Sequence, residues 1–132
     1  MTSVESRAHA RRYRQKAQEY LDSAQDNLDL ERANPAAGDA IHAGISAKDA
    51  IVTVLTGHTS KAKDHATAVK ELRQALGAHV EAAAAEKSLR ELIAIKSEVE
   101  YGTMLITLAK AKPLVRRAEL LVGLAKVLLG QR

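Results

Sequence analysis

The sequence predicts an all-α fold, an antiparallel bundle of four to five helices. Apolar residues make up 46% of the 132 residues and are largely Ala and Leu, which favour helices, while strand-favouring aromatic residues are limited to three Tyr. Apolar residues also recur at three- and four-residue steps along five segments, which places them on one face of each helix. The length fits one domain. We expect that domain over residues 10–132 and a disordered tail over residues 1–9.

The first two predicted helices are separated by Asn34 and Pro35. The first covers residues 8–32, and the second covers residues 34–56 and stops at Gly57. We expect Asn34 to cap the second helix and Pro35 to open it, because proline suits the first helical position. Small residues along the second helix would let a neighbouring helix approach closely: Ala40, Ala43, Gly44, Ala47 and Ala50.

Three further helices follow the connection GHTSKAK. The third covers residues 64–76 and stops at Gly77, and the fourth covers residues 80–101 and stops at Gly102. The fifth ends at residue 129 and begins either at Thr107, with a bend at Pro113, or at Pro113 itself.

Composition excludes several classes of function. The absence of Cys excludes disulfides, thiolate metal sites and cysteine nucleophiles. No run approaches the ~20 apolar residues that a membrane span needs, so we expect no membrane association and a cytoplasmic protein. The net charge of +4 includes basic clusters near both ends of the chain. Such clusters either attract phosphate backbones or form solvated helix faces.

Most enzyme motifs are absent. The sequence has no glycine-rich phosphate loop, no HExxH motif and no nucleophile elbow, and its five His show no paired metal-ligand spacing. We therefore expect no metal and no cofactor.

The segment KSEVEY, residues 96–101, is the main candidate binding site. Lys96 and Glu100 are one helical turn apart and could form an ion pair. Lys96 also falls on the predicted apolar face, where a buried charge needs a partner, and Asp49 in the second helix is the candidate. We expect the Asp49–Lys96 pair to fix helix register, and His65 to cap the third helix or to bond Asp49. The candidate binding residues are Asp49, His65, Lys96, Glu100 and Tyr101.

Residues 13–129 resemble proteins of the HEPN-domain family. The resemblance is carried by AIHAGISAKDAIVTVLTGHTSKAKDHATAVKELRQAL, then LRELIAIKSEVEYG, then RRAELLVGLAKVLL. Its marks are the Ala-Lys-Asp-Ala run around Lys48, the start of the third helix at Asp64, and the Lys-x4-Tyr-Gly end of the fourth helix. The resemblance implies a bundle of four to five helices that is often dimeric. In the catalytic branch, it also implies a metal-independent ribonuclease site across the dimer, formed by an Arg and a His with four to six residues between them.

This chain departs from that catalytic pattern. Lys96 stands where Arg is expected, and Tyr101 stands where His is expected. A phenol is almost fully protonated at neutral pH and is a poor base, and Lys lacks the two-pronged guanidinium. Arg73 and His79 match the spacing literally, but they precede the fourth helix, where the family motif is not expected.

Three functional hypotheses follow. The first is a non-catalytic HEPN-like domain, a dimeric binding or scaffold module for a nucleotide, RNA or a protein. The second is an HEPN-type ribonuclease, the toxin of a toxin–antitoxin pair, with an antitoxin or nucleotidyltransferase as its partner. The third is an obligate helical dimer without a ligand, joined through the exposed side of the small-residue stripe on the second helix or through the Leu-rich fifth helix.

Overall fold

The computed structural model describes residues 3–59 and 64–130, and within them not the side chain of His65. The described part is helical and contains no strand. Its elements are α1 (Ser3–Asp29), α2 (Ala33–Thr56), α3 (His65–Leu76), α4 (Ala82–Ala94), α5 (Lys96–Tyr101) and α6 (Leu108–Leu128). The predicted all-α bundle is confirmed, with the predicted fourth helix divided into α4 and α5 at Ile95.

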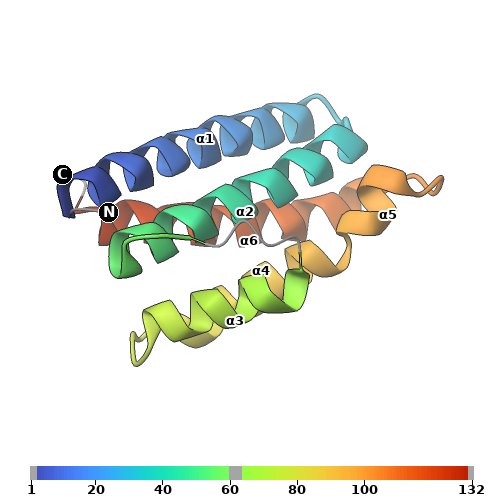
Figure 1. Ribbon diagram of the computed structural model, residues 1–132. Coiled ribbons are helices and arrows are strands. Elements are labelled where there is room, and N and C mark those ends of the chain that lie inside the picture. The colour runs from blue at the N-terminus through green and yellow to red at the C-terminus, as the bar shows by residue number, and fades with distance from the viewer. Residues whose placement is uncertain (1–2, 60–63, 131–132) are drawn as a thin grey trace.

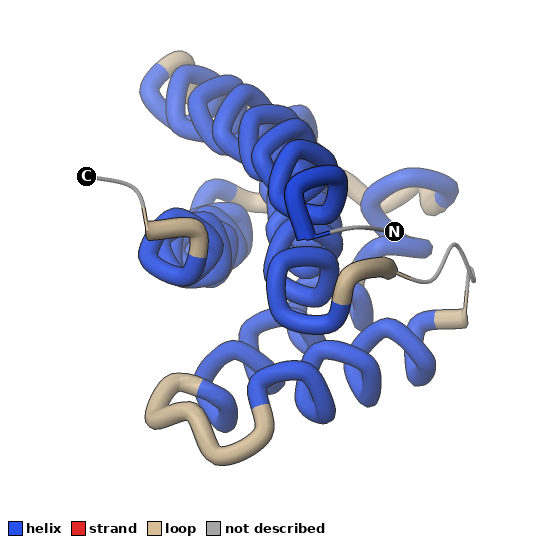
Figure 2. The backbone as a smooth tube through the Cα atoms, turned by 60° about the vertical axis from the view of Figure 1, so that its left-hand side comes forward, coloured by secondary structure: helices blue, strands red, loops and turns tan. Residues whose placement is uncertain are grey.

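Helix α2 is the centre of the bundle and packs against every other helix of the described chain. Helix α1 lies along one side of α2, and α3 and α4 lie on the opposite side (Figures 1 and 2). Helix α6 completes the core by packing against α1, α2 and α4. Helix α1 packs only against α2 and α6, which leaves its outer face uncovered by the rest of the described chain.

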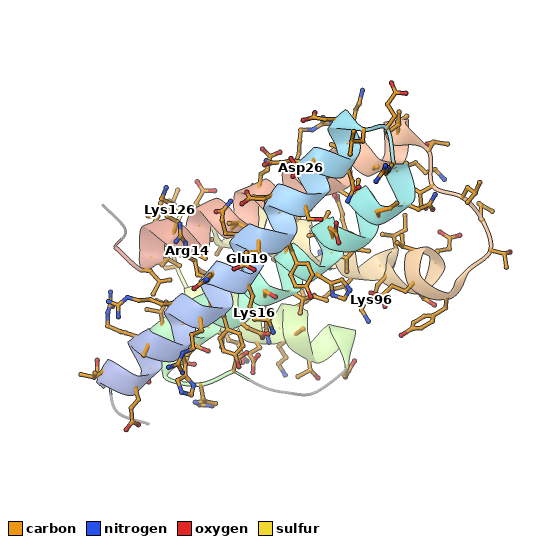
Figure 3. All side chains as sticks on the ribbon, turned by 90° about the horizontal axis from the view of Figure 1, so that it is seen from above. Arg14, Lys16, Glu19, Asp26, Lys96 and Lys126 are labelled. Atoms are coloured by element: carbon orange, nitrogen blue, oxygen red, sulfur yellow. The ribbon has the colours of Figure 1, made fainter. Side chains whose placement is uncertain are left out.

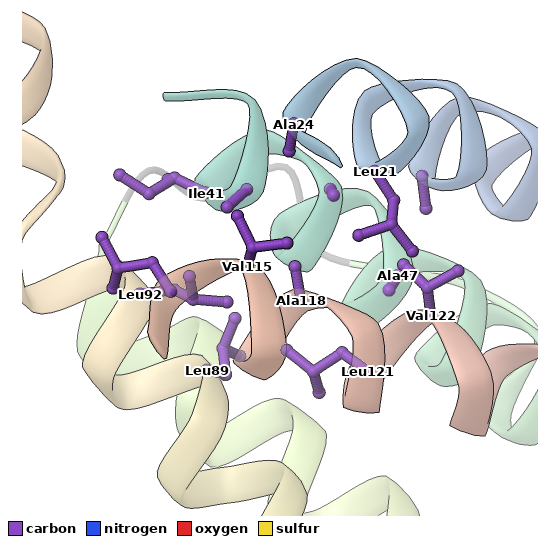
Figure 4. Close-up of a cluster of buried hydrophobic side chains, with 14 of the residues drawn as sticks. Leu21, Ala24, Ile41, Ala47, Leu89, Leu92, Val115, Ala118, Leu121 and Val122 are labelled. Carbon is purple, nitrogen blue, oxygen red and sulfur yellow. The ribbon is translucent and has the colours of Figure 1, made fainter. Parts of the chain in front are cut away.

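The small residues of α2 explain its central position. Ala40, Ala43, Ala47 and Ala50 are completely buried, and a Cβ added at Gly44 would lie 2.5 Å from Leu92 Cδ1. The larger side chains that fill the core come from the helices around α2 as well as from α2 itself, as Figure 4 shows for Leu21, Ile41, Leu92 and Leu121. The predicted close approach is therefore confirmed.

The same burial limits which side chains of α2 and α6 could form a dimer interface. The small residues of α2 already pack inside the bundle, and α6 buries Leu114, Leu121 and Leu124. These buried side chains are not available to a second copy, but Val127 of α6 is 69% exposed, so a dimer interface on either helix stays a prediction.

The N-terminal residues differ from the prediction. Residues 3–9 belong to α1, where we expected a tail. The buried Ser6 donates a hydrogen bond from Oγ to the Gly57 carbonyl at 3.3 Å, and Arg7 donates to the Leu129 carbonyl at 2.9 Å. These contacts with the C-terminal ends of α2 and α6 hold the first turns of α1 in place.

Two helix starts also bear on the predictions. The start of α2 differs from its prediction, and the start of α6 decides between two alternatives. Asn34 does not cap α2, because that helix already begins at Ala33, and Asn34 Oδ1 instead accepts a hydrogen bond from the Ile106 amide at 3.0 Å. Thr107 caps α6 and accepts a hydrogen bond from the Lys110 amide, so Pro113 lies inside the helix. No helix of the described residues combines the length and the apolar character needed to cross a bilayer.

Candidate functional site

A polar stripe on α2 organises the first candidate site. Asp39, His42 and Asp49 recur at helical spacing on a helix that is mostly apolar. Asp39 accepts hydrogen bonds from Ser23 Oγ at 2.6 Å and Asn27 Nδ2 at 3.1 Å, both on α1. These hydrogen bonds place the Asp39 end of the stripe at the contact between α1 and α2.

Three charged or titratable side chains form the His42–Glu100–Lys96 cluster. Lys96 Nζ lies 3.3 Å from Glu100 Oε2, and His42 Nε2 lies 3.1 Å from Glu100 Oε1. The His42 ring stacks on Tyr20 with centroids 5.2 Å apart. Lys96, labelled in Figure 3, is about a quarter exposed, and His42 is 44% exposed. In this cluster, a partly exposed imidazole and an ammonium group both contact the carboxylate of Glu100.

The predicted Asp49–Lys96 pair is wrong. The break at Ile95 turns α5 so that none of its residues is buried, and Lys96 pairs with Glu100 within its own helix. Asp49 instead lies 3.1 Å from Lys48 Nζ. Tyr101 is 77% exposed and so shares no closed site with Asp49. The predicted Lys96–Glu100 contact is present.

Lys48 is a charged residue that is buried in the core. It is 4% exposed, and its Nζ contacts Asp49, Glu71 Oε1 at 2.5 Å and Thr59 Oγ1 at 3.0 Å. Thr59 in turn donates to Asp49 at 2.9 Å. Because three oxygen atoms surround the ammonium group, it serves to join α2 to α3 and is not free to react. The side chain of His65, for which we predicted a cap or a bond to Asp49, lies outside the described residues; its backbone begins α3 after the Asp64 cap.

Arg73 and His79 do not form a pair. Arg73 Nη1 donates to Glu86 Oε1 at 3.0 Å. His79 Nδ1 accepts a hydrogen bond from the Glu81 amide at 3.0 Å, so its ring is held at the start of α4. The literal sequence match is thus divided between two separate structural contacts.

The second candidate site is a groove of about 550 Å³ between α3 and α4. Its aliphatic lining comes from both helices: Ala66, Val69, Ile93 and Ala94. Lys70, Arg73 and Arg90 also line it, with Glu86 as the sole carboxylate among the lining residues. Glu86 pairs with both Arg73 and Arg90, so one negative charge faces two guanidinium groups, and Lys70 makes no ion pair within the described residues. The groove therefore combines several aliphatic lining residues with an excess of positive charge.

Sequence reasoning missed His42, Lys48 and the groove. The stripe of Asp39, His42 and Asp49 was a signal for His42, because polar residues at helical spacing on a mostly apolar helix mark a contact with other polar groups. The groove gave no signal, because it depends on how the consecutive helices α3 and α4 pack together, which no local pattern records. Among the described residues, no three His, Asp or Glu side chains gather closely enough to hold a metal ion.

Comparison with known proteins adds no relative. The chain matches no protein-family model, and a search of curated proteins finds no significant match.

Proposed function

We propose that the protein is a non-catalytic HEPN-like binding module that holds an acidic, amphipathic helix of a partner protein in the groove between α3 and α4. The groove itself carries this proposal: its lining combines aliphatic side chains with three cations and a single carboxylate. A helix that lays an apolar face into a groove is a common form of peptide recognition, and acidic residues flanking that face would meet the cations.

The lining favours a peptide over RNA. Recognition of single-stranded RNA relies on aromatic side chains on which bases stack, and no aromatic residue lines the groove. Aliphatic side chains such as Val69 and Ile93 instead suit the Leu, Ile or Val side chains of a helical peptide.

A designed peptide tests the proposal. The probe is a capped, fluorescently labelled helix of about 15 residues with Leu along one face and Glu on its flanks. Its control carries Lys in place of Glu. We expect the acidic peptide to bind and the basic peptide not to bind. Arg73→Glu should weaken binding about fivefold to tenfold, because it reverses a charge at the rim of the groove.

The matched control is Arg116→Glu, on the exposed face of α6, which makes the same charge change away from the groove. Glu86→Gln should tighten binding, because it frees Arg73 and Arg90 for the peptide. Equal binding of the two peptides, equal effects of Arg73→Glu and Arg116→Glu, or displacement of the peptide by single-stranded RNA would each contradict the proposal.

The His42–Glu100–Lys96 cluster favours a second candidate function, that of an HEPN-type ribonuclease toxin. An imidazole can transfer protons and an ammonium group can stabilise charge on phosphate. This candidate predicts RNA cleavage that His42→Ala and Lys96→Met each abolish, and growth arrest on expression. The binding-module proposal predicts no cleavage that depends on either residue, or on His79.

The proposal includes a homodimer in the cytoplasm. An antitoxin or a nucleotidyltransferase is the partner that the resemblance suggests. The dimer is supported by the family resemblance.

A further inference from the structure

The outer face of α1 carries charges that are sorted by sign. Arg11, Arg12 and Lys16 occupy its N-terminal half. Glu19, Asp22, Asp26 and Asp29 occupy its C-terminal half. All seven side chains are exposed, and none makes an ion pair with another described residue. Figure 3 looks onto this face and labels Lys16, Glu19 and Asp26 along it.

This order opposes the helix dipole. The N-terminal end of a helix favours carboxylates and the C-terminal end favours cations, so Asp26 and Asp29 lie beside carbonyl groups that repel them. Local helix stability therefore does not account for the pattern. Glu5, the carboxylate nearest the N-terminal end, already has an interaction within its own chain.

We propose that α1 is the dimer interface and binds α1 of a second copy in an antiparallel arrangement. An antiparallel pair brings the cationic half of each helix against the acidic half of the other. With the two-fold axis at the level of Ala17, Arg12 and Asp22 stand five residues on either side of it. Each Arg12 then faces the partner's Asp22, and the contact occurs twice.

Two exposed apolar side chains fit the same arrangement. Val4 and Leu30 are 79% and 60% exposed and stand thirteen residues on either side of Ala17. An antiparallel pair buries each Val4 against the partner's Leu30 at the two ends of the interface. A nucleic acid suits this face less well, because its phosphates would meet the four carboxylates.

The size of the face predicts a weak dimer. A helix of 27 residues is about 40 Å long, and two such helices in contact bury on the order of 1,000 Å², near the lower limit for a specific interface. This proposal identifies the surface through which the proposed homodimer forms. It rests only on the homodimer part of the proposed function and not on the groove. The groove lies on α3 and α4, on the other side of α2 (Figure 2).

Sedimentation velocity of the full chain tests the interface. We expect a monomer–dimer equilibrium whose dissociation constant rises about tenfold or more between 50 mM and 500 mM NaCl, because salt screens exposed charges. Arg12→Glu and Asp22→Arg should each be monomeric where the wild type is dimeric. An equimolar mixture of the two variants should form a heterodimer, because each mutated residue then faces an opposite charge. Arg116→Glu on α6 is the control and should dimerise normally.

Circular dichroism should show that these exposed substitutions keep the fold. The pair Val4→Cys and Leu30→Cys in one chain should give a disulfide-linked dimer on oxidation, without background from native cysteines. A wild-type chain that stays monomeric at low salt, a dimer unaffected by Arg12→Glu, or a mixture that fails to associate would each overturn the interface. Failure of the acidic peptide to bind would remove the groove proposal and leave this one standing.

Discussion

Lys48 of α2 and Glu71 of α3 form an ion pair in which Nζ lies 2.5 Å from Oε1, while only 4% of the lysine is exposed. The same ammonium group contacts Asp49 at 3.1 Å and donates to Thr59 at 3.0 Å. These contacts join the central helix to one wall of the proposed groove. The buried lysine therefore helps to hold α3 on α2, together with the buried Leu72 and Leu76 of α3.

Lys48→Met should lower the free energy of unfolding by about 2 kcal/mol, because it leaves the partly buried carboxylates of Asp49 and Glu71 facing each other without a cation. Urea denaturation followed by circular dichroism measures the change. Lys70→Met is the control, since Lys70 is exposed and should change stability by less than about 0.5 kcal/mol. Equal stability of the two variants would show that the Lys48 contacts contribute nothing.

Gly44 and Gly123 should respond in opposite directions to substitution by Ala. A Cβ at Gly44 would lie 2.5 Å from Leu92 Cδ1, and Leu92 is fully buried, so Gly44→Ala should destabilise by about 1–2 kcal/mol despite the better helix propensity of Ala. A Cβ at Gly123 meets nothing within 4 Å, so Gly123→Ala should stabilise by about 0.5–1 kcal/mol. Thermal unfolding of both variants decides this, and a stabilised Gly44→Ala protein would show that α2 and α4 are packed less closely.

Asn34→Ala should destabilise the protein by about 1 kcal/mol and speed hydrogen exchange at the Ile106 amide, because that amide loses its partly buried acceptor. Exchange measured by NMR locates the effect. Asn34→Asp keeps an oxygen acceptor at the same place and should retain protection. Unchanged protection in Asn34→Ala would mean that the hydrogen bond does not hold the loop before α6.

Periodicity predicted the helices because each apolar face is a local pattern, and the stops at Gly57 and Gly77 were equally local. The contacts of single residues were harder to predict. Asn34 looked like a cap, yet its oxygen bonds Ile106, which is distant in sequence. Lys96 looked like a core residue because the break at Ile95 involves neither Gly nor Pro, and an unbroken helix would have turned it inward. The two walls of the groove meet through tertiary packing, which no local pattern records.

Arg117 and Glu91 provide a test of how burial affects the contribution of an ion pair to the free energy of unfolding. Arg117 Nε and Glu91 Oε2 lie 2.5 Å apart, the same separation as in the Lys48–Glu71 pair, and their contact joins α6 to α4. The two side chains are 37% and 39% exposed, however, so water and salt screen their attraction. Arg117→Met should cost about 0.5 kcal/mol in 0.1 M NaCl and less in 1 M NaCl, whereas the loss from Lys48→Met should persist at high salt. Urea denaturation at both salt concentrations makes the comparison, and a loss at Arg117 as large and as salt-independent as that at Lys48 would refute it.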